Sequence, residues 1–360
     1  MYGVELRTAG YRIKNGSRAF RKLVIPYIQS RIHGYEFRPL LSYLYTEWKC
    51  NIDCHYCFQF NNKVKGMSIE TAIQSIDWLK TTGCRLIAIM GGEPLLRRNF
   101  ILEVVEYAAK SGFFVYLPTN GRLLTEDFID RVGQAGVTAI NLAVDCVEEI
   151  DGLPKALKLI EPQFKYLVKQ QKKHGYLVFL NVNITSKNLE DVKQLTEVTH
   201  EYRIGIDYHI NQPPYLEQTH YKHLDNDTYI REEHWNAVDK VIDWIISKNK
   251  QGYPMVNSIA HLEAMKKFVR GELVQWSCRA GHNTMFIRVD GTLVPCFDMT
   301  SSKKDWGNVF TGYRFNPRGL KAMKQECIKH CLSTCHYNMS HYYDTFARSL
   351  KWATKHARIG

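Results

Sequence analysis

Short apolar runs alternate with longer amphipathic stretches between residues 40 and 214, and this alternation limits the possible folds more than any other feature of the sequence. The apolar runs are rich in branched and aromatic residues and lie at 41–46, 85–90, 113–118, 138–144, 176–184 and 205–210. The amphipathic stretches lie between them at 68–81, 99–111, 125–134, 154–173 and 188–202. Strands that are separated by helices run parallel because each connection crosses the sheet. The pattern therefore predicts an α/β fold, an open or partial (β/α)6 barrel.

The sequence changes character after residue 214. Residues 215–275 lack strand patterns, contain one amphipathic stretch at 232–248, and are interpreted as a helical connector. A second unit begins at Trp276 and contains two alternating runs around Asp290 and Gly291, which is a strong hairpin signal. The predicted organisation has five parts: a basic N-terminal extension at 1–39, the barrel at 40–214, the connector at 215–275, a small domain of a β-hairpin and a helix at 276–336, and a basic C-terminal helix at 337–360.

Composition narrows the class of protein. The chain has 360 residues, of which 45% are apolar, so it can bury a large core. No segment approaches the roughly 20 consecutive apolar residues of a membrane span. Charges interrupt the N-terminal residues where a signal peptide needs an apolar core. These features predict a cytosolic protein, in which clustered cysteines indicate metal or redox chemistry rather than disulfides.

Three cysteines, Cys50, Cys54 and Cys57, follow the first predicted strand. Ligands bind at the carboxyl ends of the strands in such barrels, so the three thiols are expected at the mouth. Three thiolates can bind three irons of a [4Fe–4S] cluster and leave the fourth iron open, as a catalytic zinc keeps one open position. A zinc site would instead need a fourth ligand such as His55, which lies inside the motif and would strain a small chelate ring.

The spacing Cys-x3-Cys-x-Tyr-Cys from Cys50 to Cys57 resembles the motif of the radical S-adenosylmethionine (SAM) superfamily. The resemblance implies that the open iron binds SAM through its amino and carboxylate groups. It also implies that the reduced cluster cleaves SAM to methionine and a 5′-deoxyadenosyl radical, which takes a hydrogen atom from a substrate or adds to it. A reducing partner such as flavodoxin or ferredoxin would supply the electron.

Matching motifs stand at the ends of the next strands. Gly91, Gly92, Glu93 and Pro94 look like the family's Gly-Gly-Glu-Pro element, which holds the SAM amino group. Glycines let the backbone approach a ligand, and a glutamate offers a counter-charge to an ammonium. The resemblance extends to further cofactor-binding positions: Tyr56 near adenine, Thr119 and Asn120 after the third strand, Asp145 in the Ser-x-Asp element, where Ala143 replaces the serine, and Asn183 on the fifth strand.

Five more cysteines gather near the C-terminus: Cys278, Cys296, Cys327, Cys331 and Cys335. Cysteines that bracket a hairpin and precede a late cysteine run resemble the twitch or SPASM extensions of radical SAM enzymes, which carry auxiliary iron–sulfur clusters. Four thiols complete one auxiliary [4Fe–4S] cluster, so one of the five is left over. A zinc knuckle built from the same cysteines is the alternative.

Two cysteines lie outside both groups. Cys84 is expected in the core. Cys146 follows Asp145 at the barrel mouth and could donate a hydrogen atom as in radical epimerases, although an inert buried thiol is the more common situation.

The net charge of +12 is concentrated at the ends of the chain. Residues 1–38 hold eight Lys or Arg against two acidic residues, and residues 321–360 hold seven against two. Basic ends with interleaved aromatic residues suit peripheral contact with an anionic membrane, although solvated faces of terminal helices would look the same. Together with a likeness of residues 331–337 to enzymes that adenosylate hopanoid lipids, they favour a small-molecule, isoprenoid or lipid substrate.

Two other functions stay open. Peptide-modifying radical SAM maturases, either epimerases or crosslinking enzymes, are the main alternative; many carry a leader-binding domain, and about 40 residues precede the first strand here. A zinc-stabilised nucleic-acid-binding protein would also be basic and rich in clustered cysteines. The Gly-Gly-Glu-Pro element at a strand end argues against nucleic acid as a partner.

Overall fold

A curved sheet of eight strands forms the centre of the part of the chain that the computed structural model describes, residues 17, 20–32, 37–272, 274 and 276–344. The strands follow the order β6-β5-β4-β3-β2-β1-β7-β8. Six of them are parallel to one another: β1 (Leu41–Glu47), β2 (Leu86–Gly91), β3 (Phe114–Thr119), β4 (Ala139–Ala143), β5 (Leu177–Ile184) and β6 (Gly205–Ile210).

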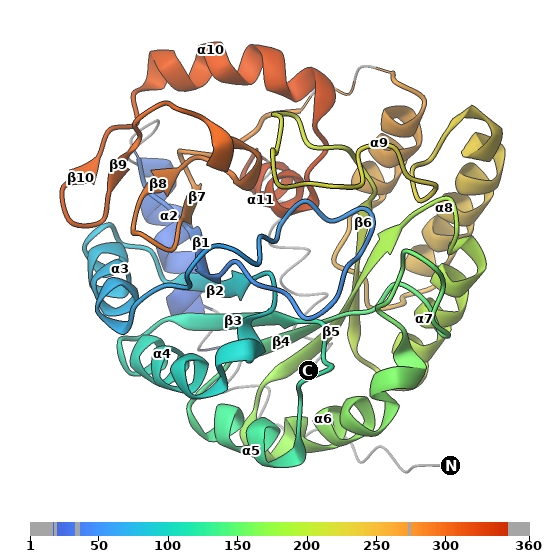
Figure 1. Ribbon diagram of the computed structural model, residues 1–360, viewed down its shortest axis with the longest axis horizontal. Helices are drawn as coiled ribbons and strands as arrows, with labels where there is room; N and C mark the ends of the chain where they lie inside the picture. Colours follow the sequence, from blue (N-terminus) through green and yellow to red (C-terminus); the bar gives the residue numbers. More distant parts are fainter. Residues whose placement is uncertain (1–16, 18–19, 33–36, 273, 275, 345–360) are drawn as a thin grey trace.

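One helix joins each strand of this series to the next and covers the outside of the sheet (Figure 1). These helices are α3 (Ile69–Thr81), α4 (Arg98–Lys110), α5 (Glu126–Gln134), α6 (Glu161–His174) and α7 (Leu189–Glu201). Helices α3, α4, α5 and α7 begin within one residue of their predicted starts, whereas α6 begins at Glu161 rather than at 154. The Ser68 hydroxyl accepts a hydrogen bond from the Thr71 N–H at 3.1 Å and so caps α3. The predicted partial (β/α)6 barrel is confirmed.

The predicted hairpin belongs to the same sheet as the barrel. Strand β7 (Thr284–Ile287) runs parallel to β1, with Leu41 opposite Thr284, and β8 (Leu293–Val294) pairs antiparallel with β7. Without β7, β1 would be an edge strand with unpaired backbone groups, which favours the addition of another strand. The hairpin, which the sequence assigns to a domain separate from the barrel, therefore shares backbone hydrogen bonds with the barrel strand β1.

The remaining elements close the open side of the barrel. The connector holds two helices, α8 (Trp235–Lys250) and α9 (Ile259–Val269), of which only the first is predicted from the sequence. Two short strands, β9 (Gly307–Asn308) and β10 (Gly312–Tyr313), precede α10 (Pro317–Cys327) and α11 (Thr334–Asp344). At the other end of the chain lies α2 (Ile25–Ile32), and most residues of both predicted basic ends lie outside the described part.

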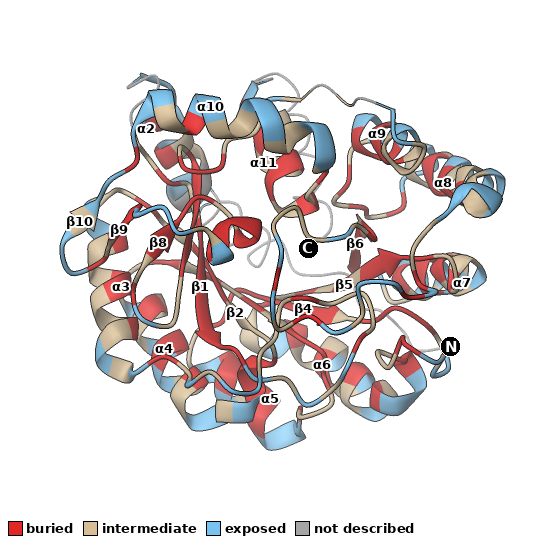
Figure 2. Cartoon of the chain, turned by 45° about the horizontal axis from the view of Figure 1, so that its top comes forward, coloured by how far each residue is buried: buried red, intermediate tan, exposed pale blue. Residues whose placement is uncertain are grey.

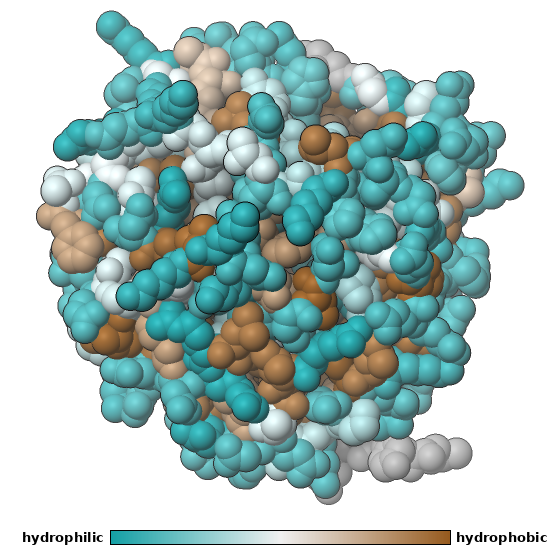
Figure 3. Space-filling view, viewed as in Figure 1, coloured by the Kyte–Doolittle hydropathy of each residue, from teal (hydrophilic) through white to brown (hydrophobic). Residues whose placement is uncertain are grey.

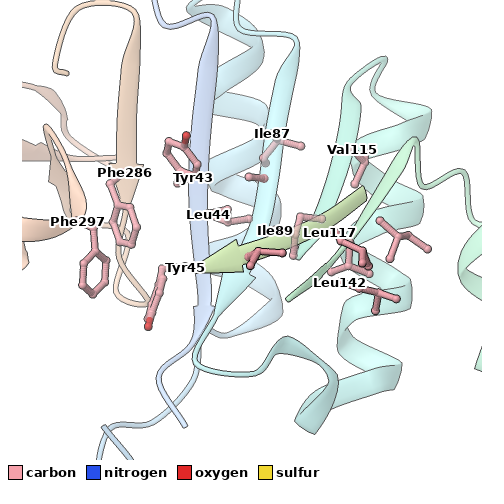
Figure 4. Packing of buried hydrophobic residues seen from close by; sticks show 14 of the residues in the cluster. Tyr43, Leu44, Tyr45, Ile87, Ile89, Val115, Leu117, Leu142, Phe286 and Phe297 are labelled. Atoms are coloured by element: carbon pink, nitrogen blue, oxygen red, sulfur yellow. The ribbon is translucent and has the colours of Figure 1, made fainter. Parts of the chain in front are cut away.

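The core lies mainly between the sheet and its helices. Strands are buried along most of their length, whereas the helices expose their outer faces (Figure 2). Figure 4 shows Leu44 and Ile87 on the helix side of the sheet and Tyr45 with Phe286 and Phe297 on the other side. The Tyr45 and Phe286 rings lie 5.2 Å apart, so aromatic side chains fill the barrel interior next to β1 and β7. No helix among the described residues is long and apolar enough to span a bilayer.

Candidate functional site

The loop that follows β1 carries the first cysteine group across the mouth of the barrel (Figure 1). Cys54 is buried, and Cys50 and Cys57 are partly exposed. Burial raises the pKa of Cys50, and with a smaller contribution from the nearby Cys57 thiolate it reaches about 11. The pKa of Cys54 is also raised, first by burial and then by the thiolates of the other two. The three thiols therefore lie close enough to interact, as ligands of one cluster must.

The Gly-Gly-Glu-Pro segment holds this loop through its backbone. The Gly92 N–H donates to the Glu47 carbonyl oxygen at 2.8 Å, and the Glu93 N–H donates to the Lys49 carbonyl oxygen at 2.8 Å. A Cβ atom on Gly92 would lie 2.5 Å from the Lys49 carbonyl oxygen, and one on Gly91 would collide with that of Glu47. The glycines thus allow close approach to the chain leading into the cysteine loop. Pro94 follows and begins a short 3₁₀ turn.

Glu93 joins the ends of β2 and β3. Its side chain is fully buried; Oε1 accepts hydrogen bonds from the Thr119 hydroxyl at 2.7 Å and the Leu95 N–H at 2.9 Å, and Oε2 accepts from the Asn120 N–H at 2.8 Å. Burial raises the pKa of Glu93, and these hydrogen bonds oppose the rise. The Asn120 side-chain N–H donates to the Asn51 side-chain oxygen at 2.8 Å, which ties the end of β3 to the cysteine loop.

A second polar group links the same loop to the end of β4. The Tyr56 hydroxyl donates a short hydrogen bond to Oδ2 of Asp145, and the Lys155 ammonium donates to the Tyr56 oxygen at 2.7 Å. The Asn183 N–H donates to Oδ1 of Asp145 at 2.9 Å, so both carboxylate oxygens are used. Burial raises the pKa of Tyr56, and the Asp145 carboxylate raises it further. Tyr56, Asp145 and Asn183 are thus brought together as the motif predicts.

Lys155 was not identified from the sequence. Burial lowers the pKa of its ammonium, but the Asp145 carboxylate and the three cysteine thiolates outweigh burial and raise it overall. It lies on a loop, residues 146–157, that folds back onto the cysteine motif: the His55 N–H donates to the Gly152 carbonyl oxygen at 3.0 Å. A lone lysine in a loop carries no periodic signal, so only the fold reveals its position.

Cys146 lies in a small buried cluster against which Tyr56 and Ile150 pack. Its side chain has no exposed surface and packs with Leu153 and Ala156. The thiol donates to the Leu153 carbonyl oxygen at 3.2 Å, and burial raises its pKa to about 12. These contacts are those of an inert packed thiol, and they give no support to a hydrogen-donor role. Cys84 is likewise fully buried in the core, as the sequence predicts.

The second cysteine group is divided by the structure. Four of its members line one pocket: Cys278, Cys296, Cys327 and Cys331. Cys335 does not line that pocket; burial raises the pKa of its thiol to about 11, and the Asp207 carboxylate on β6 adds to the rise. The Tyr43 hydroxyl on β1 donates to the Cys335 carbonyl oxygen at 3.0 Å. Cys335 therefore faces the barrel side of α11, which sequence spacing could not reveal.

A single metal ion and an iron–sulfur cluster need different arrangements of thiols. In the described part of the chain, no three His, Cys, Asp or Glu side chains are close enough together to hold a single metal ion. A cubane has a different requirement because each thiolate binds a different iron atom. Three neighbouring thiols in the first group, of which that of Cys54 is buried, and four thiols around one pocket in the second fit iron–sulfur clusters in number and chemistry.

The fold and this mouth define a class of enzyme built on a partial (β/α) barrel with cysteines after its first strand. Residues 49–199 match the model of the radical SAM superfamily. Over these residues, which are less than half of the chain, the protein is similar to radical SAM enzymes.

Two curated proteins of Methanosarcina barkeri (strain Fusaro / DSM 804) are similar in sequence. The AdoMet-dependent heme synthase is 25% identical over 169 residues, which cover 45% of this chain and 47% of that protein. The Fe-coproporphyrin III synthase is 23% identical over 215 residues, which cover 57% of this chain and 51% of that protein. This chain thus spans about half the length of these relatives.

Solved structures share the fold. Streptococcus suis SuiB bound to S-adenosylmethionine superimposes with a TM-score of 0.61 at 18% identity, covering 86% of this chain and 75% of SuiB. The anSMEcpe structure with bound AdoMet and the Cp18Cys peptide gives a TM-score of 0.59 at 18% identity, covering 89% of this chain and 99% of that one. At this identity the likeness concerns the fold alone.

Proposed function

We propose that this enzyme cleaves SAM reductively at a [4Fe–4S] cluster held by Cys50, Cys54 and Cys57. One observation carries the proposal: the three thiols share one loop at the mouth of a partial (β/α) barrel, and the Gly-Gly-Glu segment fixes that loop. Three thiolates leave one iron for SAM, and neither a zinc site nor a nucleic-acid-binding module accounts for the strand-end motifs.

A cluster held by these three cysteines would supply one electron, taken from a reduced flavodoxin or ferredoxin, for cleavage of the S–C5′ bond of SAM to methionine and a 5′-deoxyadenosyl radical. Hydrogen abstraction from a substrate C–H bond then yields 5′-deoxyadenosine and a substrate radical; addition to the substrate is the other outcome. Whether SAM is regenerated depends on the substrate.

The side chains around the mouth would hold SAM. Glu93 is the acceptor for its ammonium, and the hydrogen bonds from Thr119 and Asn120 keep that carboxylate in place. Tyr56 and Asp145 are hydrogen-bonded to each other; the aromatic ring suits adenine, and the carboxylate orders the end of β5 through the Asn183 N–H. Lys155 supplies a cation for this side of the site.

The auxiliary cluster is assigned here to Cys278, Cys296, Cys327 and Cys331. These four thiols surround one pocket, which supports a fully ligated [4Fe–4S] cluster in a twitch-like region. Cys335 is then the cysteine left over. A zinc knuckle would use the same thiols, and measurement of iron against zinc separates the two.

The class of substrate is proposed from the similar proteins. Named relatives synthesise haem or Fe-coproporphyrin III, and SuiB was solved with a precursor peptide, so a small molecule and a peptide are both represented among similar proteins. We retain a small-molecule, isoprenoid or lipid substrate as the first proposal and a peptide as the second.

Peripheral membrane contact from the cytosol is supported by one described feature. Phe20, Ile25, Ile28 and Ile32 are exposed, and their spacing places them on one side of the N-terminal helix. The face of the molecule seen in Figure 1 is otherwise largely hydrophilic, with separate apolar patches (Figure 3). Co-sedimentation with phosphatidylserine vesicles should fall in an Ile28→Ser/Ile32→Ser variant; unchanged sedimentation would argue against this contact.

The proposed activity is tested by anaerobic reconstitution followed by reduction in the presence of SAM. Wild-type protein should form 5′-deoxyadenosine, and a Cys50→Ala/Cys54→Ala/Cys57→Ala variant should form none. A Cys84→Ala variant is the matched control because that thiol is buried in the core. Formation of 5′-deoxyadenosine by the triple variant would contradict the assignment.

A further inference from the structure

The two faces of β5 and β6 differ in burial. On β6 the side chains of Ile206 and Tyr208 point toward the helices and are fully buried. The alternate side chains, Asp207 and His209, point into the barrel and keep 14% and 25% of their side-chain surface exposed. Asn181 on β5 lies opposite Asp207 in the strand register and is partly exposed in the same way. Solvent therefore reaches the barrel interior beside these polar residues.

Only one of the two carboxylate oxygens of Asp207 has a neighbouring side chain as a partner among the described residues. Its Oδ2 lies 3.4 Å from Nε2 of His209, and the Asn181 side-chain amide lies 2.8 Å from the same nitrogen. If the amide donates to Nε2, that nitrogen carries no proton for the carboxylate. Oδ1 of Asp207 is buried and has no hydrogen-bond partner within the described residues. An unpaired buried carboxylate oxygen is costly, so a missing donor is expected.

A second acceptor faces the same interior from neighbouring strands. The Asn141 amide on β4 donates to the Tyr116 hydroxyl on β3, and Oδ1 of Asn141 is buried without a partner among the described residues. Asn141 lies opposite Phe179 of β5 in the strand register, two residues before Asn181, so the side chains of Asn141 and Asn181 project from the same face of the sheet. Two unpaired acceptors thus share one part of the barrel.

The ion pairs around Asp207 indicate that the missing hydrogen-bond donor is a cation rather than a neutral group. Lys155, the buried cation of the mouth, is 3.9 Å from Asp145, and within the described residues the ion pair of Asp207 is with His209 alone. A carboxylate that is mostly buried and lacks a lysine or arginine partner attracts a cation that the protein does not provide. A neutral isoprenoid would leave both acceptors unpaired.

We propose that Asp207 and Asn141, supported by Asn181 and His209, form a recognition site inside the barrel for an ammonium group of the substrate. This inference rests on the proposed function, because it places the substrate in the barrel whose mouth holds SAM. It changes the preferred substrate from a neutral isoprenoid or lipid to an amine-bearing molecule. The amine belongs either to a small molecule, such as an aminocyclitol, or to a lysine side chain of a peptide.

The test is anaerobic titration calorimetry on the reconstituted, SAM-loaded enzyme with matched probes. The probes are 2-deoxystreptamine and its di-N-acetyl form, and the peptide acetyl-Gly-Lys-Gly-amide and its Nε-acetyl-lysine form. Wild-type enzyme should bind one of the two amines at least about tenfold more tightly than its acetylated form, and Asp207→Asn should remove that preference. The pair that shows it tells a small molecule from a peptide.

Controls distinguish failure of this inference from failure of the proposed function. Asp127→Asn changes an exposed carboxylate on α5 and should keep the preference for the amine. The proposal would be overturned if neither amine bound wild-type enzyme better than its acetylated form, or if Asp207→Asn kept the preference. A lowered melting temperature of Asp207→Asn with unchanged amine binding would show a structural role instead. Loss of 5′-deoxyadenosine formation by wild-type enzyme would contradict the proposed function, whatever the probes do.

Discussion

Lys155 shows how one side chain can matter to a site without belonging to any motif. It donates to the Tyr56 oxygen at 2.7 Å and lies 3.9 Å from the Asp145 carboxylate, which is almost fully buried. Without the ammonium, that carboxylate would be a buried charge lacking a cation. The cysteine loop and the end of β4 are therefore held together by charge as well as by packing.

Replacement of Lys155 by Met should lower the free energy of unfolding by about 1–3 kcal/mol, since Asp145 and Tyr56 lose a buried partner. It should also raise the KM for SAM in the 5′-deoxyadenosine assay. Lys155→Arg should recover most of both properties. Chemical denaturation and SAM titration measure the two effects.

The control for this change is Lys158→Met. Lys158 lies in the same region but pairs with the exposed Glu148, and both side chains are more than half exposed. Such a pair contributes little to stability. Equal effects of the two substitutions would show that Lys155 has no special role.

Gly92 offers a second test at the scale of a residue. An added Cβ would lie 2.5 Å from the Lys49 carbonyl oxygen, so Gly92→Ala should displace the cysteine loop. A displacement of about 1 Å can lower the rate about 100-fold, and we expect 5′-deoxyadenosine formation to fall on that scale. In Gly319→Ala the new Cβ meets only the side chains of Lys304 and Asn316, so activity should be kept. Normal activity of Gly92→Ala would contradict the proposed rigidity.

Each motif position that the residue patterns predict is tied to a strand end. Glu93, Thr119 and Asn120 meet in the structure since parallel strands bring their carboxyl ends to one edge. The pattern could not separate Cys335 from its four neighbours, because the separation depends on which side of α11 packs against β1. It also gave no sign of Asp207, whose inward direction follows from the curvature of the whole sheet.

At the scale of elements, the strands and crossover helices lie where the spacing of apolar residues predicts them. The contacts of the C-terminal part do not follow from any such spacing. The pairing of β7 with β1 joins residues more than 200 positions apart, and no local signal specifies it. Helix α9 was missed although Ser258 caps it, with its hydroxyl accepting from the His261 N–H at 3.1 Å. An isolated serine is a weak start signal when the segment has little apolar period.

The packing of α9 against α11 should depend on pH. His261 is fully buried, stacks on Tyr337 with the rings 4.3 Å apart, and has its pKa lowered to about 3 by burial. Between this value and the unfolded pKa near 6.5, the unfolded chain binds the additional proton, so stability falls as the pH falls. Acidification from pH 7 to 5.5 should cost about 1 kcal/mol through this residue.

Comparison of His261→Phe with wild-type protein by chemical denaturation at these two pH values measures the effect. The variant keeps a ring on Tyr337 and should lose about 1 kcal/mol of the pH dependence. His200→Phe is the matched control, because His200 is exposed and stacks on Tyr253. An unchanged pH dependence in His261→Phe would show that other groups account for it.

At the scale of the whole molecule, the two groups of thiols lie near different strands of one continuous sheet. The first group follows β1, and the second surrounds a pocket formed after β7 and β8 and beside α10. Because β7 pairs with β1, the two groups are held by a shared core rather than by separate domains. Loss of the second group should therefore change iron content without unfolding the barrel.

Iron analysis of reconstituted variants tests the division of the cysteines. Wild-type protein should contain about eight irons, as two clusters of four. A Cys278→Ala/Cys331→Ala variant should contain about four, while Cys335→Ala should keep about eight. A loss of four irons in Cys335→Ala, or zinc in place of iron, would contradict the assignment.

The central claim is that three thiolates leave one iron of the first cluster for SAM. Electron–nuclear double resonance of the reduced enzyme, with SAM labelled at its amino nitrogen and carboxylate oxygens, tests this directly. We expect hyperfine coupling from the cluster to both labels in wild-type enzyme. A reduced cluster that showed no coupling to either label in the presence of saturating SAM would contradict it.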